Sequence, residues 1–165
     1  MMITRRRIAA VLAGLLLTVS TRALAADPPS IADRPLTIAD PYIRATPPGQ
    51  TNTAMFLTLT NHTDRQHALI AASSLLADRV ELHAHRMENG LAMMRPVQRI
   101  AIPAGESVTL QPGGLHVMLL GIRRPIQPGD CAAVTFTFET GDQIQVTAPI
   151  RRIRHSDIAP HDRRH

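Results

Sequence analysis

Short stretches in which apolar and polar residues alternate limit the possible folds of this chain more than any other feature. Alternation with a period of two is typical of half-buried β-strands, whereas a helix would repeat its apolar residues every three to four positions. The clearest stretches are Thr53–Thr60, Arg79–His85 and Leu115–Leu120. Turn-forming residues such as Asn89–Gly90 and Gln111–Gly114 separate them, and no long stretch has a helical period. This pattern predicts an antiparallel β-sandwich.

The sequence predicts four parts in the 165-residue chain. Residues 1–25 contain three consecutive arginines, an apolar run from Ile8 to Val19 and the small-residue signal Ala23–Ala25, which together predict a secretory signal peptide cleaved near Ala25. The apolar run is too short to span a bilayer stably. Residues 26–35 are predicted to be a flexible lead-in, residues 36–150 one β-sandwich domain, and residues 151–165 a disordered tail rich in Arg and His.

The charge balance of the exported part is close to neutral. The leader contains four of the 18 basic residues and no acid, which leaves 14 arginines against 13 acids. There is no basic stripe with interleaved aromatic residues, so we expect no nucleic-acid partner. No Ser-His-Asp or Cys-His arrangement and no Gly-rich phosphate loop is recognisable, so we expect no enzymatic activity. After removal of the leader, no apolar stretch approaches the length of a membrane span.

The chain has one cysteine, Cys131, which cannot form an intramolecular disulfide. Because Cys131 begins an apolar strand, we expect it to be a small buried hydrophobic residue. Any metal site that needs two thiolates is also excluded.

Histidines and methionines recur on the polar faces of the predicted strands. His83 and His85 are two residues apart, as are His116 and Met118, so each pair shares one face of its strand. The turn at Asn89–Gly90 should place Met94 across a hairpin from His83. We expect His116 and Met118 to point outward, with the neighbouring Leu and Val residues in the core. Imidazole and thioether are neutral ligands that together suit a soft, singly charged metal such as Cu(I).

The spacing His83-x10-Met94-x21-His116-x-Met118 resembles the signature of periplasmic copper chaperones of the PCu(A)C type. The resemblance extends over nearly all of residues 36–149. It includes the segments Pro41–Gln50, Leu59–Asn61, Val80–His83, Met94–Val97 and Leu115–Leu119.

The resemblance implies a cupredoxin-like Greek-key sandwich that binds Cu(I) through two His and two Met. By that match the metal ligands are His83, Met94, His116 and Met118. The resemblance also implies a periplasmic location and delivery of copper towards the copper centres of cytochrome c oxidase. The partner would be a copper-accepting protein, such as an oxidase subunit or another copper chaperone. Additional residues outside the strict pattern are His85 and Met87 as auxiliary ligands, and His155, His161 and His165 as a second, Cu(II) site in the tail.

Other interpretations remain open at this stage. A zinc-binding or zinc-buffering protein would use His83, His85 and His116. A β-sandwich interaction domain would carry its His and Met residues incidentally. A copper electron-transfer protein is disfavoured, because Cys131 is not next to a His and a Met on one loop.

Overall fold

The computed structural model describes residues 34–88 and 90–152, which form ten β-strands. The strands are β1 (Leu36–Arg44), β2 (Asn52–Asn61), β3 (His67–Ser73), β4 (Ala77–Glu88), β5 (Leu91–Pro96), β6 (Ile100–Ile102), β7 (Ser107–Leu110), β8 (Leu115–Ile122), β9 (Cys131–Phe138) and β10 (Gln143–Arg151). Within these residues no helix is long and apolar enough to cross a bilayer.

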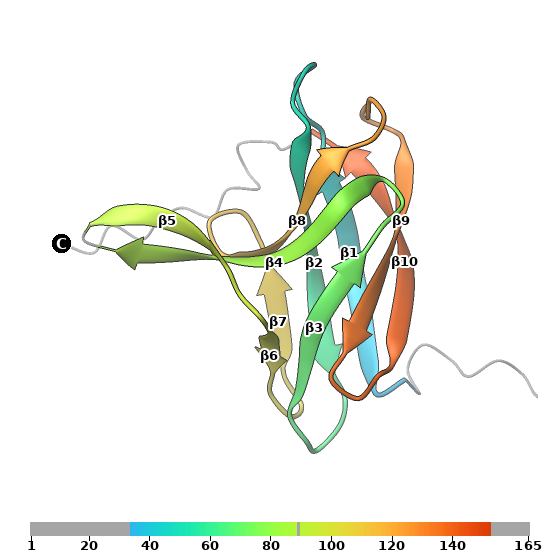
Figure 1. Cartoon of the computed structure of the whole chain (residues 1–165). Helices are drawn as coiled ribbons and strands as arrows, with labels where there is room; N and C mark the ends of the chain where they lie inside the picture. The colour runs from blue at the N-terminus through green and yellow to red at the C-terminus, as the bar shows by residue number, and fades with distance from the viewer. Residues whose placement is uncertain (1–33, 89, 153–165) are drawn as a thin grey trace, which may run out of the picture.

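The strands pack as two layers (Figure 1). Neighbouring strands follow the order β5-β4-β8-β2-β1-β10-β9-β3-β6, and β7 pairs with the second half of β2. Every strand pairing among the described residues is antiparallel except that of β1 with β10, where Ile43 lies beside Ile150. This parallel pair joins the two layers, because β1 belongs to one and β10 leads into the other.

The space between the layers contains the hydrophobic core. Its fully buried side chains include Leu59 and Leu119 from one layer and Val134, Phe136 and Phe138 from the other. These residues occupy alternate positions on their strands, as expected when one face of a strand is buried and the other is solvated. The all-β, cupredoxin-like Greek-key sandwich predicted from the sequence is therefore confirmed. The predicted signal peptide lies in residues 1–33, outside the described residues.

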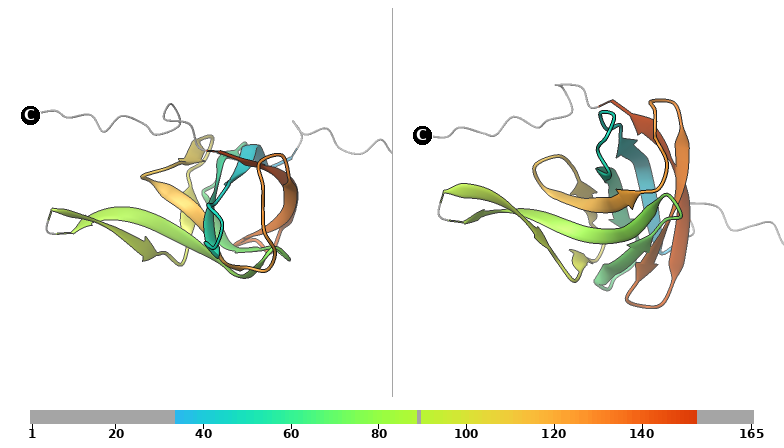
Figure 2. Two further views of the ribbon diagram at one scale, coloured as in Figure 1. Left: turned by 90° about the horizontal axis from the view of Figure 1, so that it is seen from above. Right: turned by 45° about the horizontal axis from the view of Figure 1, so that its top comes forward.

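The β4–β5 hairpin projects away from the sandwich, as Figures 1 and 2 show. Its strands end at Glu88 and start again at Leu91, so a two-residue turn joins them, and Gly90 there has a φ of 79°. The tight turns of two-residue hairpins require backbone conformations with positive φ, which Gly90 supplies here.

The chain changes layer directly after the hairpin. Strand β5 ends at Pro96, and β6 pairs with β3 in the other layer.

Candidate metal centre

Two neighbouring strands, β4 and β8, bring three of the predicted ligands onto one face of the sheet. His83 lies directly opposite His116 in the antiparallel register, and Met118 lies opposite Glu81. Directly opposed residues of antiparallel strands point to the same side. The ring centroids of His83 and His116 are 5.7 Å apart. The two imidazoles are therefore adjacent, and the Met118 side chain is on the same face two residues further along β8.

The hairpin adds the fourth predicted ligand in a register that differs from the expected one. Met94 lies directly opposite His85, whereas the residue opposite His83 is Pro96. The prediction that Met94 faces His83 across the hairpin was wrong by two residues, although Met94 remains diagonal to His83 on the shared face. The cause is the two-residue turn, which pairs Glu88 with Leu91 and thereby sets all the pairs that follow.

His116 is buried, with 4% of its surface exposed, which contradicts the prediction that it points outward. Its ring lies 6.3 Å from that of Phe56, which in turn lies 5.2 Å from the ring of Tyr42. These aromatic residues cover the face that a simple alternation would leave open. Burial lowers the pKa of His116 below the ordinary value of 6.5, and the positive charge that His83 and His85 could carry lowers it further, against an opposing hydrogen bond to Gly114.

A tight turn fixes which nitrogen of His116 is available to a ligand. Nδ1 of His116 is 3.0 Å from the carbonyl oxygen of Gly114, which can only accept, so Nδ1 carries the proton and donates. The sequence Gln111-Pro-Gly-Gly positions that carbonyl: Gly114 N donates to Gln111 O, and Gly113 has a φ of 80°. Proline followed by a left-handed glycine is the pattern of a type II turn. Nε2 of His116 is left with its lone pair free.

His83 is held from the opposite side of its ring. Nε2 of His83 is 2.9 Å from a carboxylate oxygen of Glu81, two residues earlier on the same face. Nδ1 of His83 is buried and has no hydrogen-bond partner. Among the described residues, Nδ1 of His67 is the other buried side-chain atom without a partner. Such atoms are unusual in a folded protein, and the one on His83 is able to accept a ligand.

A surface cavity of about 370 Å³ collects most of the soft side chains. Its lining includes His85, Met94, His116 and Met118, together with Phe56. His85 is edge-on to His116, with ring centroids 5.7 Å apart, but His83 is not part of the lining. The cavity therefore brings together three of the four predicted ligands and the auxiliary His85.

The thioethers of the hairpin are accessible to solvent. Met94 is 51% exposed, and Met87, the other auxiliary residue, is 71% exposed on the same face of β4. Three of the five exposed large hydrophobic residues in the described part of the chain lie on this hairpin, the third being Leu91. The candidate centre is thus buried at His116 and open at Met94.

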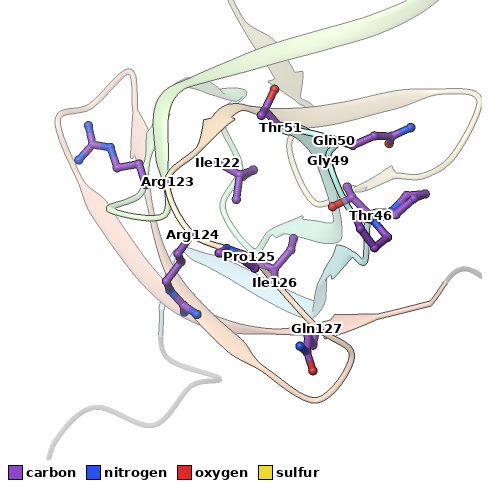
Figure 3. A pocket seen from close by; sticks show the side chains of 12 residues that line it. Thr46, Gly49, Gln50, Thr51, Ile122, Arg123, Arg124, Pro125, Ile126 and Gln127 are labelled. Carbon is purple, nitrogen blue, oxygen red and sulfur yellow. The ribbon is translucent and has the colours of Figure 1, made fainter.

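Other parts of the molecule do not contribute to this cluster. A second cavity, at the end of the sandwich between the β1–β2 and β8–β9 loops, is lined by residues such as Thr46, Ile122 and Gln127 and by no His or Met (Figure 3). Cys131 is exposed, so the expectation that it would be buried was wrong. It begins the outer face of β9, whose buried face starts at Ala132.

The tail histidines His155, His161 and His165 lie outside the described residues.

Within residues 34–88 and 90–152, no group of three or more His, Cys, Asp or Glu residues is placed to hold a metal ion. Sequence reasoning did not assign roles to Glu81 and Gly114, which hold the two imidazoles. The alternation Glu81-x-His83 was a usable signal for the first, and the second lies two residues before His116, in the turn that precedes β8.

Solved structures with the same architecture include PCuAC domains. The "Copper-bound PCuAC domain from PmoF2" superposes with a TM-score of 0.63 and is 26% identical, covering 73% of this chain and 95% of that domain. The structure described as "CuI-DR1885 from Deinococcus Radiodurans" has a TM-score of 0.59 and is 33% identical, covering 70% of this chain and 76% of that one. The fold is thus of the PCuAC type.

Sequence comparison gives the family. Residues 36–150 match the LpqE-like family, described as "Putative lipoprotein LpqE-like". A protein of Leifsonia xyli subsp. xyli named "Putative lipoprotein Lxx21020" is 31% identical over 146 residues, covering 87% of this chain and 86% of that protein. The chain belongs to the LpqE-like family.

Proposed function

We propose that this protein is an exported copper carrier that binds Cu(I) through His83, Met94, His116 and Met118. The observation that carries the proposal is the meeting of two imidazoles, each with one nitrogen free, and two thioethers on one face of three neighbouring strands. Imidazole and thioether ligands suit Cu(I), and thioethers disfavour Zn(II). Two of the solved structures that this chain resembles are described as holding copper.

The exposure of Met94 supports a carrier rather than a storage site. A metal that is to be passed on by ligand exchange needs at least one ligand that an incoming group can replace from solvent. Met94 is half exposed on the projecting hairpin, whereas His116 is buried. The recipient would be a copper-accepting protein, such as an oxidase subunit or another copper chaperone, in the assembly of cytochrome c oxidase. The protein has no catalytic role in this scheme.

Export to the periplasm would follow from the leader in residues 1–25, with cleavage near Ala25. The relatives named as lipoproteins support export. The only cysteine of this chain is Cys131, so the leader offers no thiol for a lipid. In this proposal the released protein contains the domain in residues 36–150 and the tail in residues 151–165, with no apolar stretch long enough to span a membrane.

The test is a Cu(I) titration of the exported chain against a chromophoric chelator. The double variant Met94→Leu/Met118→Leu should bind Cu(I) much more weakly than the wild type. Met93→Leu is the matched control, because Met93 lies opposite Arg86 on the other face of the same hairpin. A double variant that binds as tightly as the wild type would place the site elsewhere.

Zinc binding through His83, His85 and His116 remains the second candidate, because both other rings lie 5.7 Å from that of His116. It predicts that His85→Ala abolishes zinc binding while the methionine changes have no effect. Absence of tight binding of either metal would leave a β-sandwich interaction domain as the remaining interpretation.

A further inference from the structure

The carboxylate of Glu81 determines where the proton of His83 resides. Oε2 of Glu81 lies 2.9 Å from Nε2 of His83, and the two side chains are 33% and 13% exposed. An ionised carboxylate can only accept, so Nε2 must be the protonated nitrogen. Glu81 also lies 3.8 Å from the guanidinium of Arg79.

The other nitrogen, Nδ1, is left buried and without a partner. A buried polar atom without a hydrogen bond carries a desolvation penalty, which a bound metal ion would offset here. His116 shows the reverse arrangement, because its Nδ1–H donates to Gly114 and its Nε2 is free. The two facing imidazoles are thus held as opposite tautomers.

We propose that Glu81 is a positioning residue for the copper site: it fixes the tautomer of His83 so that Nδ1 binds the metal, while His116 binds through Nε2. This inference rests on the proposed function. A carboxylate that accepts from the far nitrogen of a metal-binding imidazole fixes the orientation of the ring and makes the other nitrogen a better donor. The copper ion would then lie between two rings that approach it through different atoms.

The same contact distinguishes His83 from its neighbour His85. Both rings are 5.7 Å from that of His116, so distance alone does not choose between them. Within the described residues, no carboxylate is hydrogen-bonded to the ring of His85. That ring instead makes an edge-on contact with the ring of His116. Because Glu81 already fixes the orientation of the His83 ring, His83 loses less side-chain conformational freedom than His85 when it binds the metal. His83 is therefore the favoured ligand of the two.

The experiment compares Glu81→Ala and Glu81→Gln with the wild type by two measurements. Long-range ¹H–¹⁵N NMR on the metal-free protein reports the tautomer of each imidazole. Chelator competition reports the Cu(I) affinity. Glu139→Ala is the matched control, since Glu139 bonds Arg99 by a similar 3.0 Å contact in the other layer.

In the wild type, His83 should carry its proton on Nε2 and His116 on Nδ1. Glu81→Ala should give His83 a mixture of tautomers, leave His116 unchanged and weaken Cu(I) binding about 10–100-fold, the usual cost of losing such a partner. Glu81→Gln retains an oxygen acceptor without the charge, so it should restore the tautomer and most of the affinity.

Two outcomes would overturn the inference. One is a Glu81→Ala protein whose His83 tautomer and Cu(I) affinity both match the wild type. The other is a Glu81→Gln protein with the correct tautomer but affinity as weak as Glu81→Ala, which would assign the effect to charge. A wild-type protein that binds no Cu(I) would instead refute the proposed function, and the tautomers of the metal-free protein would still be measurable.

Discussion

At the scale of single residues, His116 is where the core and the candidate metal centre meet. Its ring packs against Phe56 and is almost fully buried, while its Nδ1–H is bound by the Gly114 carbonyl. The fold therefore keeps this imidazole neutral with one lone pair available. A buried neutral ring is ready to bind a metal without first releasing a proton.

The burial of His116 predicts how the stability of the metal-free protein depends on pH. The pKa of His116 is lowered in the folded state, mainly by desolvation, so the unfolded chain binds the proton first as the pH falls. The contribution to stability is complete above the unfolded pKa of about 6.5 and is lost as the pH falls towards the folded pKa. Urea unfolding should show a lower free energy of unfolding at about pH 5.5 than at about pH 7.5. In His116→Gln this difference should shrink, and an equally steep dependence would contradict the assignment.

At the scale of one element, β8 combines two functions on its two faces. Val117 and Leu119 are fully buried in the core, whereas His116 and Met118 belong to the candidate centre. The strand that carries the ligands is thus held in place by the same residues that stabilise the sandwich. Substitutions on the core face should therefore change stability, and substitutions on the other face should change metal affinity.

The prediction for β8 compares two neighbouring substitutions. Leu119→Ala should lower the free energy of unfolding by about 2–5 kcal/mol, because it leaves a cavity in the core, and should leave the Cu(I) affinity of the folded protein close to that of the wild type. Met118→Leu nearly conserves volume, so its cost in stability should be below about 1.5 kcal/mol while copper affinity falls. Denaturant unfolding and chelator competition measure both. Loss of affinity in Leu119→Ala equal to that in Met118→Leu would contradict this separation.

Most strands could be predicted because each depends on local alternation and on the turns beside it. The register of the hairpin was also accessible, since a two-residue turn after Glu88 fixes the pair His85–Met94. The burial of His116 could not be predicted, because Phe56, which packs against its ring, belongs to another strand, β2. The parallel pairing of the first and last strands leaves no local pattern in the sequence either. Local periodicity records which face of a strand is apolar but not what covers the other face.

At the scale of the whole molecule, the candidate centre occupies a single layer, formed there by β5, β4 and β8. The single cysteine lies on β9 in the other layer and is exposed. An exposed thiol in an oxidising medium pairs with a thiol of another molecule when it has no partner in its own chain.

The exposed thiol predicts a covalent dimer in oxidising buffer. Size-exclusion chromatography of the wild type should show a dimer that a reducing agent converts to monomer, and Cys131→Ser should remain monomeric under both conditions. The Cu(I) affinity of Cys131→Ser should equal that of the reduced wild type, since the thiol lies outside the candidate centre. A dimer that persists in Cys131→Ser would show that another surface causes the association.

The course of β1 separates two ends of the molecule. The strand enters at Leu36, beside Asn61 of β2, and leaves at Arg44, which lines the same cavity as Met118. At about 3.3 Å per residue, nine residues put on the order of 25 Å between those points. A tether fused ahead of Leu36 would therefore attach to the end of the molecule opposite the candidate metal centre. That centre would stay accessible to a partner protein while the tether is bound to a surface.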